Sequence, residues 1–439
     1  MKKIYIFLSF CVFLGGSEVK FEGNLHELIL AAQSSNLAQI SNYEPQKAQL
    51  QKEAVKSAYM PSFTIDGGYS FLSGDINVLR PQRAATARAI LELAVYDGGK
   101  REALLSSLSH LSAAEILKNE EYQNLLAFNA TKLYFGFLSL SELATAKEGE
   151  INYLKNALNR LEKYYRAGLS DESEYEAINA RYAMALAERL DISQHQNEIK
   201  NQIYALTGRD IEPVAGSRIA FTDEENSVPP KSAKPELEAL RLNFAAALED
   251  EKITASETNP QIFIKNTYTF MRTHYDRNLL PVQYRSALEP YFDDFFKPNL
   301  NTNELILGFS WKAFDFGANK KQREIKRISA LQAKLNLDQK RLQNELNLTN
   351  IKNDLKTLEQ KIAAGESALN SAQTSLNAVS KKYEAGLLGY VEFLNATAQS
   401  FSAGSALELS KSKFEIKKAE YLYERGGKIA ENIEKTERK

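Results

Sequence analysis

The sequence predicts a mainly α-helical chain of two similar halves, each with a β-hairpin and a long coiled-coil helical hairpin. Three observations predict this fold class: a motif repeated at a fixed interval, alternating apolar runs, and two long spans without proline. The interval is 218 residues, and it separates two copies of the pattern Tyr-x-Ala-Gly-Leu, which begin at Tyr165 and Tyr383. Self-similarity at a fixed interval indicates a tandem duplication.

The helical hairpins are predicted from an apolar ladder that precedes each copy of this motif. The ladders run from Ile151 to Tyr165 and from Leu369 to Tyr383, with steps that alternate between three and four residues. This is the heptad spacing of coiled coils. The prolines all lie outside 82–212 and 299–439, and proline disrupts helix interiors. We therefore expect helical hairpins at 100–208 and 318–426.

The β-hairpins are predicted where the apolar pattern changes to a period of two residues. The alternating runs are Phe63 to Phe71, Ala87 to Val95, Ile262 to Phe270 and Leu305 to Ala313. Such alternation places one face of a strand in an apolar medium and the other in water. The runs predict hairpins at 62–97 and 261–315, and the second has the longer connection, an aromatic and proline-rich loop.

Each hairpin leads into its long helix through a similar short segment, whose residues are Asp97, Gly98 and Gly99 in the first half and Asp315 and Gly317 in the second. Glycine allows the sharp change from strand to helix. The predicted organisation is a signal peptide at 1–17, a first repeat at 18–208, a surface linker at 209–234, a second repeat at 235–427 and a mobile charged tail at 428–439.

The signal peptide is predicted from Lys2 and Lys3, the apolar run that follows them, and the small residues just after that run. Cys11, the only cysteine, lies inside this run, so neither disulfides nor thiolate metal sites are expected in the exported chain. No later apolar run is long enough for a transmembrane helix. If the exported chain enters a membrane, it must do so as a β-barrel.

Charge and motifs argue against several function classes. The net charge of −1 gives no basic excess for nucleic acid. The four histidines are scattered without ligand spacing, and no phosphate-binding glycine loop or nucleophile motif is present. We therefore expect no cofactor, no metal site and no enzyme activity.

The repeated strand exits, the Tyr-x-Ala-Gly-Leu tips and the segment from Val391 to Ala396 together resemble the outer-membrane efflux protein family. This resemblance implies a homotrimer in the outer membrane of a Gram-negative cell, in which four strands from each copy close a β-barrel that contacts lipid. The helices would form an α-tunnel across the periplasm. Trp311, Tyr69 and Tyr268 would then be interfacial aromatic residues.

The same resemblance implies an exit duct for a tripartite efflux pump or a type I secretion system, without chemistry of its own. Its partners would be a periplasmic adaptor protein and an inner-membrane transporter. An exported coiled-coil scaffold that joins envelope layers without conducting stays open as the alternative, and the exported substrate is not indicated.

The resemblance also places a periplasmic gate at the tips of the helical hairpins. In the second tip the gate positions fall on Glu392 and on Asn395, which is uncharged here, and the first tip offers Glu174 and Asp171. An ordinary solvated helix face is the alternative for each acid. We expect the second tip to form the inner throat and the first to stand outside it. The implied adaptor contacts are Arg166, Ala167, Gly168, Leu169, Ser170, Glu384, Ala385, Gly386, Leu387 and Leu388.

Overall fold

The computed structural model describes residues 21–74, 78–167, 171–220 and 234–435. The chain divides into two compact units, which we call the helical unit and the sheet unit. The helical unit comprises Met1–Tyr43, Lys118–Leu237 and Lys340–Lys439, and the sheet unit comprises Glu44–Leu117 and Glu238–Gln339. The predicted signal peptide at 1–17 lies outside the described residues.

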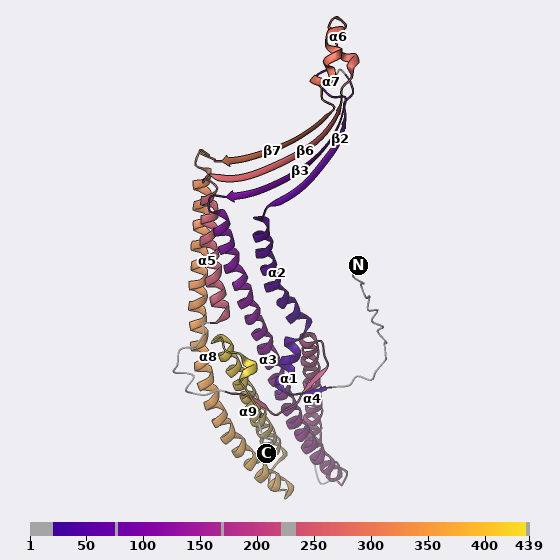
Figure 1. Ribbon diagram of the computed structural model, residues 1–439. Coiled ribbons are helices and arrows are strands. Elements are labelled where there is room, and N and C mark those ends of the chain that lie inside the picture. Colours follow the sequence, from indigo (N-terminus) through magenta and orange to yellow (C-terminus); the bar gives the residue numbers. More distant parts are fainter. Residues whose placement is uncertain (1–20, 75–77, 168–170, 221–233, 436–439) are drawn as a thin grey trace. The chain divides into compact units, whose positions relative to one another are not determined.

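The sheet unit contains a four-stranded antiparallel sheet in the order β2-β3-β6-β7 (Figure 1). Its strands are β2 (Ser62–Phe71), β3 (Arg83–Tyr96), β6 (Gln261–His274) and β7 (Asn299–Ser310). Both predicted hairpins are confirmed, because β2 pairs with β3 and β6 pairs with β7. The pairing of β3 with β6 joins the two hairpins into one sheet.

The connection between β6 and β7, predicted as an aromatic and proline-rich loop, includes several short helices. It contains η2 (Arg277–Leu279), α6 (Val282–Leu288), η3 (Glu289–Tyr291) and α7 (Phe292–Phe295), which lie at one end of the sheet (Figure 1). Buried Phe292 and Leu280 give this insert a small core of its own. Arg277 closes it with a salt bridge to Asp293 at 2.6 Å. This local apolar packing is the reason why the segment folds.

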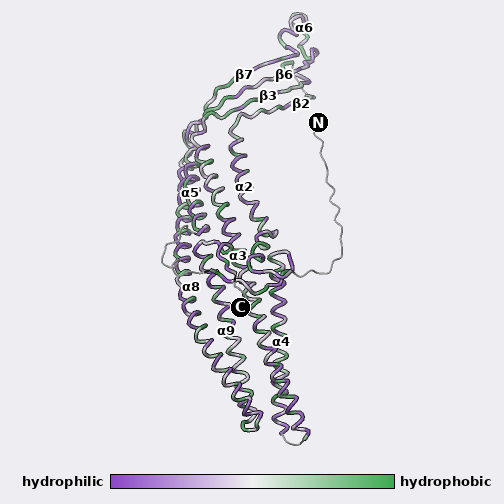
Figure 2. The backbone as a smooth tube through the Cα atoms, turned by 60° about the horizontal axis from the view of Figure 1, so that its bottom comes forward, coloured by the Kyte–Doolittle hydropathy of each residue, from purple (hydrophilic) through white to green (hydrophobic). Residues whose placement is uncertain are grey.

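The long helices are continuous and follow the repeat interval. They are α3 (Lys100–Arg166) and α8 (Ala318–Glu384), each of 67 residues, with α4 (Glu172–Thr207) and α9 (Tyr390–Glu424) as their return helices. Both ends of α8 lie 218 residues after the ends of α3. Figure 2 shows polar and apolar residues interleaved along all four helices, which is expected for helices that pack through one face only.

The two strand exits share a left-handed backbone conformation. Gly98 and Gly99 have φ angles of 78° and 91°, and Phe316 and Gly317 have φ angles of 54° and 80°. A Cβ atom on Gly98 would lie 2.6 Å from the carbonyl oxygen of Ser256, so glycine is required there for space as well as for φ. In the second exit, Asp315 caps α8 by accepting hydrogen bonds from the Gly317 and Asn319 amides.

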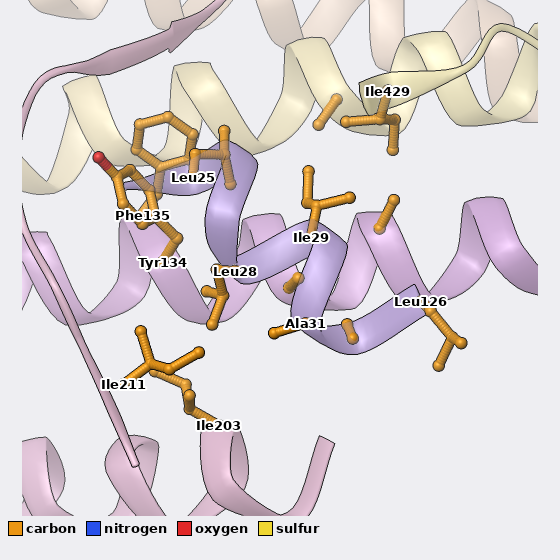
Figure 3. Packing of buried hydrophobic residues seen from close by; sticks show 14 of the residues in the cluster. Leu25, Leu28, Ile29, Ala31, Leu126, Tyr134, Phe135, Ile203, Ile211 and Ile429 are labelled. Atoms are coloured by element: carbon orange, nitrogen blue, oxygen red, sulfur yellow. The ribbon is translucent and has the colours of Figure 1, made fainter. Parts of the chain in front are cut away.

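The main core of the helical unit surrounds α1 (Leu25–Gln33), a short helix that begins with a capping box between Asn24 and Glu27. Leu25, Leu28 and Ile29 are fully buried. Figure 3 shows these side chains packed among residues from α3, α4, the short strand after α4 and the C-terminal segment, which include Leu126, Tyr134, Ile203, Ile211 and Ile429. The core therefore joins segments from both ends of the chain.

The segment from Asn24 to Tyr59 has the pattern of one or two amphipathic helices, and its proline predicts a break near Asn42 to Pro45. The structure places the break elsewhere. The chain breaks at Ser34 and Ser35, and α2 (Asn36–Ala58) continues through Pro45. The two serines support the break, because the Ser34 hydroxyl donates to the Ala31 carbonyl and Ser35 accepts from the Ala38 amide. Pro45 only leaves one helical carbonyl without its usual N–H partner.

The mobile tail predicted at 428–439 is wrong for residues 428–435. This segment forms η4 (Ile429–Glu431) and β8 (Ile433–Lys435), and β8 pairs with β5 (Ser217–Ile219). Ile429 is fully buried, and its amide donates to Asn124. The composition was misleading because Ile429 and Ile433 pack on the core, while Lys428, Glu431 and Glu434 around them are exposed.

The surface linker predicted at 209–234 is also wrong at both described ends. β4 (Ile211–Pro213) pairs in parallel with β1 (Phe21–Gly23), and Ile219 of β5 is buried. Residues 221–233 lie outside the described part. At the far end, just before α5 (Pro235–Ser256), the Lys234 ammonium is buried.

Three carboxylates balance the positive charge of this buried lysine. The Nζ atom of Lys234 lies 3.0 Å from Glu424, 3.3 Å from Glu236 and 3.5 Å from Glu121. Burial by itself lowers the pKa of Lys234, but these charges outweigh it and raise the pKa above the ordinary lysine value. Lys234 therefore anchors the start of the second repeat.

Candidate functional site

The candidate site lies in the helical unit, where the four long helices turn. The second tip connects α8 to α9 through Gly386, which has a φ angle of 69°. The Leu387 amide donates to the Lys382 carbonyl at 2.9 Å, and the Gly386 amide donates to the Tyr383 carbonyl at 3.0 Å. This is the double hydrogen bond of a Schellman motif, which terminates a helix on a left-handed glycine.

An aromatic cluster holds the two tips together. Phe393 of α9 is buried and stacks on Tyr383 of α8 and Tyr153 of α3, with ring centroids 4.6 Å and 5.5 Å away. Leu161 of α3 and Ile178 of α4 complete this core. Residues from both repeats thus form one tip core.

Two polar contacts cross between the repeats beside this cluster. The Tyr383 hydroxyl donates to Oε1 of Glu174 at 2.9 Å, and the Arg160 guanidinium lies 3.3 Å from Oε1 of Glu384. Arg160 also lies over the Tyr383 ring, 5.6 Å from its centroid. Burial is the largest cause that raises the pKa of Tyr383, and the hydrogen bond and charge of Glu174 raise it further. Tyr383 therefore stays a neutral donor.

A cavity of about 480 Å³ opens between the tips. Charged and aromatic side chains line one part of it, and the turn of the second tip lines the rest. Its lining includes Arg160, Tyr164, Glu174, Tyr383, Leu388 and Tyr390. The contacts between the repeats therefore enclose a space that a small shift of either tip would change.

The predicted gate residues do not all meet. Glu174 takes part in the contact with Tyr383. Glu392 and Asn395 are exposed, and they lie three residues apart on α9, on neighbouring turns of one face. Asp171 is the N-cap of α4 and accepts from the Ser173 amide at 3.4 Å, so it stabilises the helix start.

The predicted adaptor-contact residues also differ in their surroundings. Gly168, Leu169 and Ser170 lie outside the described residues. In the second tip Leu387 is 73% exposed, whereas Leu388 is half-buried against the cavity. Leu387 is therefore more exposed than the other large apolar side chains of this tip, including Val391 at 51%.

Sequence reasoning missed Arg160 and the bonding role of Tyr383. Tyr383 was identified as a repeat marker only. Its counterpart in the first repeat, Tyr165, instead stacks on Tyr175, with ring centroids 5.8 Å apart. The two equivalent tyrosines therefore make different contacts. The presence of a tyrosine in one tip and an acid in the other was a usable signal, but the sequence does not say which copies meet.

The described residues contain no group of three or more histidine, cysteine or acidic side chains placed to hold a metal ion. Within the same residues, none of the helices combines the length and the hydropathy that a membrane crossing requires.

Residues 231–419 match the family model described as Outer membrane efflux protein. The chain is also 21% identical over 395 residues to Outer membrane protein TolC of Escherichia coli strain K12, across 86% of this chain and 78% of that protein.

Solved structures share the fold. The outer membrane protein VceC from Vibrio cholerae has a TM-score of 0.75 at 16% identity, with 92% of this chain and 96% of VceC covered. The Campylobacter jejuni CmeC outer membrane channel has a TM-score of 0.78 at 12% identity, with 93% of this chain and 86% of CmeC covered. The resemblance to the outer-membrane efflux protein family is thus confirmed, and with it the expected outer-membrane localisation.

Proposed function

We propose that three copies of this chain form an outer-membrane channel, the exit duct of a tripartite efflux pump or a type I secretion system. Each copy contributes its four-stranded sheet to a closed barrel, and its long helices to a tunnel through the periplasm. The channel carries substrate outward without chemistry of its own, and inner-membrane partners supply the energy.

The observation that carries this proposal is the sheet with two free edges and exposed apolar side chains. Among the described residues, β2 and β7 each pair on one side only. Phe63, Tyr69, Leu307 and Phe309 are all largely exposed on these edge strands. Free strand edges are costly in lipid, and closure with neighbouring copies removes them.

The exposed face of α8 supports the trimer independently. Large apolar side chains recur along it at spacings close to helical turns, and each is about half exposed in the single chain. They are Ile325, Ile328, Leu331, Leu335, Leu342 and Leu346. A stripe of this kind on a helix favours packing against another helix, and a neighbouring copy is the partner that a closed barrel brings.

The tips supply the gate in this proposal. Tyr383 bonded to Glu174, and Arg160 paired with Glu384, hold the second tip against the first and keep the entrance narrow. Glu392 faces the throat, where three copies bring carboxylates together and attract cations. Leu387 provides the contact for a periplasmic adaptor protein.

The experiment is a planar-bilayer recording of the purified trimer. A small resting conductance that rises when Tyr383 and Arg160 are both replaced supports a gated channel. A folded, heat-sensitive but detergent-resistant trimer that never conducts, even with these contacts removed, contradicts it. Extraction from membranes by salt alone would instead favour the non-conducting scaffold.

A further inference from the structure

The second strand exit, residues 311–321, has an exposed aromatic surface in the sheet unit. Trp311, Phe314 and Phe316 are 57%, 75% and 92% exposed. The two phenylalanine rings contact each other edge to face, with centroids 4.7 Å apart. Three large aromatic side chains within six residues are therefore left open to the surroundings of the chain.

Phe316 keeps this position despite backbone strain. Its φ angle of 54° makes it the only non-glycine residue with positive φ in the described part of the chain. A bulky side chain is unfavourable in the left-handed region. Glycine occupies the matching position in the first repeat, Gly98, so the fold does not require phenylalanine here. Strain of this kind at an exposed aromatic residue points to a function for the side chain.

Lysines surround the aromatic surface. Lys312, Lys320 and Lys321 are exposed, and within the described residues none of them forms an ion pair. The one acid between them, Asp315, already accepts two amide hydrogen bonds as the cap of α8. The surface therefore combines exposed aromatic rings with three cations that are free to bind an anion.

The first strand exit is the internal control, because it has only one of these aromatic residues and neither of the two helix lysines. The residues 218 positions before Trp311, Lys312, Phe314, Phe316, Lys320 and Lys321 are Leu93, Ala94, Tyr96, Gly98, Glu102 and Ala103. Tyr96 is the one exposed aromatic side chain among them.

The first exit is also covered by the chain itself. Asn259 donates a hydrogen bond to the Gly98 carbonyl at 2.8 Å, and Arg101 lies over the Tyr59 ring at 4.4 Å. The second exit thus exposes three aromatic rings with three lysines, whereas the first exposes Tyr96 alone.

We propose that the second exit anchors the protein to anionic phospholipid at the membrane surface. Trp311, Phe314 and Phe316 enter the boundary between acyl chains and headgroups, where aromatic side chains are enriched. Lys312, Lys320 and Lys321 bind the headgroup phosphates, with their aliphatic stems along the apolar layer. This rests on the proposed membrane channel, because it needs the neighbouring strands to lie in lipid.

Trp311 is the only tryptophan in the chain, so its fluorescence reports on this surface alone. The trimer is reconstituted into phosphatidylcholine vesicles with lipids brominated either near the headgroup or deep in the acyl chain. We expect stronger quenching by the shallow bromines. In the double variant Phe314→Ser, Phe316→Gly we expect quenching to fall by roughly half, since the anchor next to Trp311 is lost. Glycine relieves the strain at residue 316, so this loss is not an effect of poor folding.

A second measurement tests the lysines. At equal mole fraction, brominated phosphatidylglycerol should quench Trp311 more than brominated phosphatidylcholine. We expect the triple variant Lys312→Gln, Lys320→Gln, Lys321→Gln to lose this preference. Lys334→Gln, an exposed lysine further along α8, should keep it. Equal quenching by the two lipids in the unchanged protein would overturn the assignment of the lysines.

The results also separate the anchor from the channel. If shallow bromines do not quench a trimer that conducts, the anchor is wrong and the channel stands. If quenching is strong in a protein that never conducts, the anchor stands and the channel fails. If Phe316→Gly lowers the detergent resistance of the trimer but leaves quenching unchanged, the surface binds a neighbouring copy, and the lipid proposal is overturned.

Discussion

The two helical hairpins occupy equivalent places in the duplicated chain but are held together by different forces. Between α3 and α4, Glu150 is 1% exposed and binds Lys147 at 2.5 Å and Arg181 at 2.8 Å. Lys147 also binds Glu188 of α4 at 2.6 Å. The residues 218 positions after Lys147, Glu150, Arg181 and Glu188 are Gly365, Ala368, Gln399 and Ala406.

At the matching positions, the two helices of the second hairpin are held by close packing and not by buried ion pairs. A Cβ atom on Gly365 would lie 3.3 Å from Leu407, so α8 and α9 approach closely there. Buried ion pairs demand one geometry, because each charge needs its partner. Contacts between small residues and a leucine permit more sliding. In the proposed gate we therefore expect α3 and α4 to form the fixed side, and α8 and α9 to form the side that moves.

The largest expected effect comes from breaking the charged cluster. Glu150→Ala leaves Lys147 and Arg181 without their buried carboxylate, which costs about 3 kcal/mol in local stability. We expect amide hydrogen exchange in the middle of α3 and α4 to accelerate by roughly 100-fold in the folded trimer. Glu148→Ala removes the neighbouring exposed pair with Arg189 and should change exchange little. Equal effects of the two variants would refute the distinction between the hairpins.

The next effect separates the two tips. Tyr383→Phe keeps the stacking on Phe393 but removes the hydrogen bond to Glu174. A hydrogen bond to a charged group contributes about 1.5 kcal/mol, so we expect the open fraction of the channel to rise roughly tenfold. Single-channel recording measures it. Tyr165→Phe is the matched control, and an equal rise there would mean that the contact between repeats does not hold the gate.

A smaller effect concerns the exposed end of the second tip. Leu387→Ala should weaken binding of the adaptor protein by roughly fivefold, because part of an apolar contact is lost. Titration of the adaptor onto the reconstituted trimer gives the affinity. Arg166→Ala in the first tip is the comparison, since Arg166 pairs with Glu162 of its own helix. Stronger loss with Arg166→Ala would place the adaptor on the first tip.

The two predicted gate acids need different measurements. Because Glu174 accepts a hydrogen bond from Tyr383, we expect its replacement to raise resting conductance whether or not it lines the proposed throat. Glu392 is exposed in the single chain, and Glu392→Gln should weaken block by divalent cations by roughly threefold, with little change in resting conductance. If Glu174→Gln reduces cation block more than Glu392→Gln does, the first tip forms the inner throat.

The smallest expected effect is a lack of pH dependence. Because its pKa is raised, Tyr383 stays protonated past the ordinary tyrosine pKa of about 10. Its hydrogen bond is fully present below that pH, and it is lost only as the pH rises through the higher folded value. Resting conductance should therefore stay constant from about pH 7 to about pH 9. A rise in that window that Tyr383→Phe abolishes would show that the hydroxyl ionises earlier.

The sequence predicted those features that depend on local patterns. Alternation from Phe63 to Phe71 matches β2, and the proline-free spans match α3 and α8. The sequence-based prediction failed in segments of polar composition where a few apolar residues are buried. Ile429 in a charged segment and Ile219 in a predicted linker are both buried, because a core that was invisible in the sequence lies beside them. Pro45 failed as a helix breaker because one lost hydrogen bond is affordable in a long helix.

By itself, the sequence determined the duplication interval, the hairpins and the positions of the acids, because periodicity and glycine positions act within a few residues of each other. Only the tertiary structure decided which copies meet. It placed Tyr383 of the second repeat on Glu174 of the first, and it left Phe316 exposed where Gly98 is covered. These are contacts between segments far apart in the chain, and their geometry depends on how whole helices and strands pack.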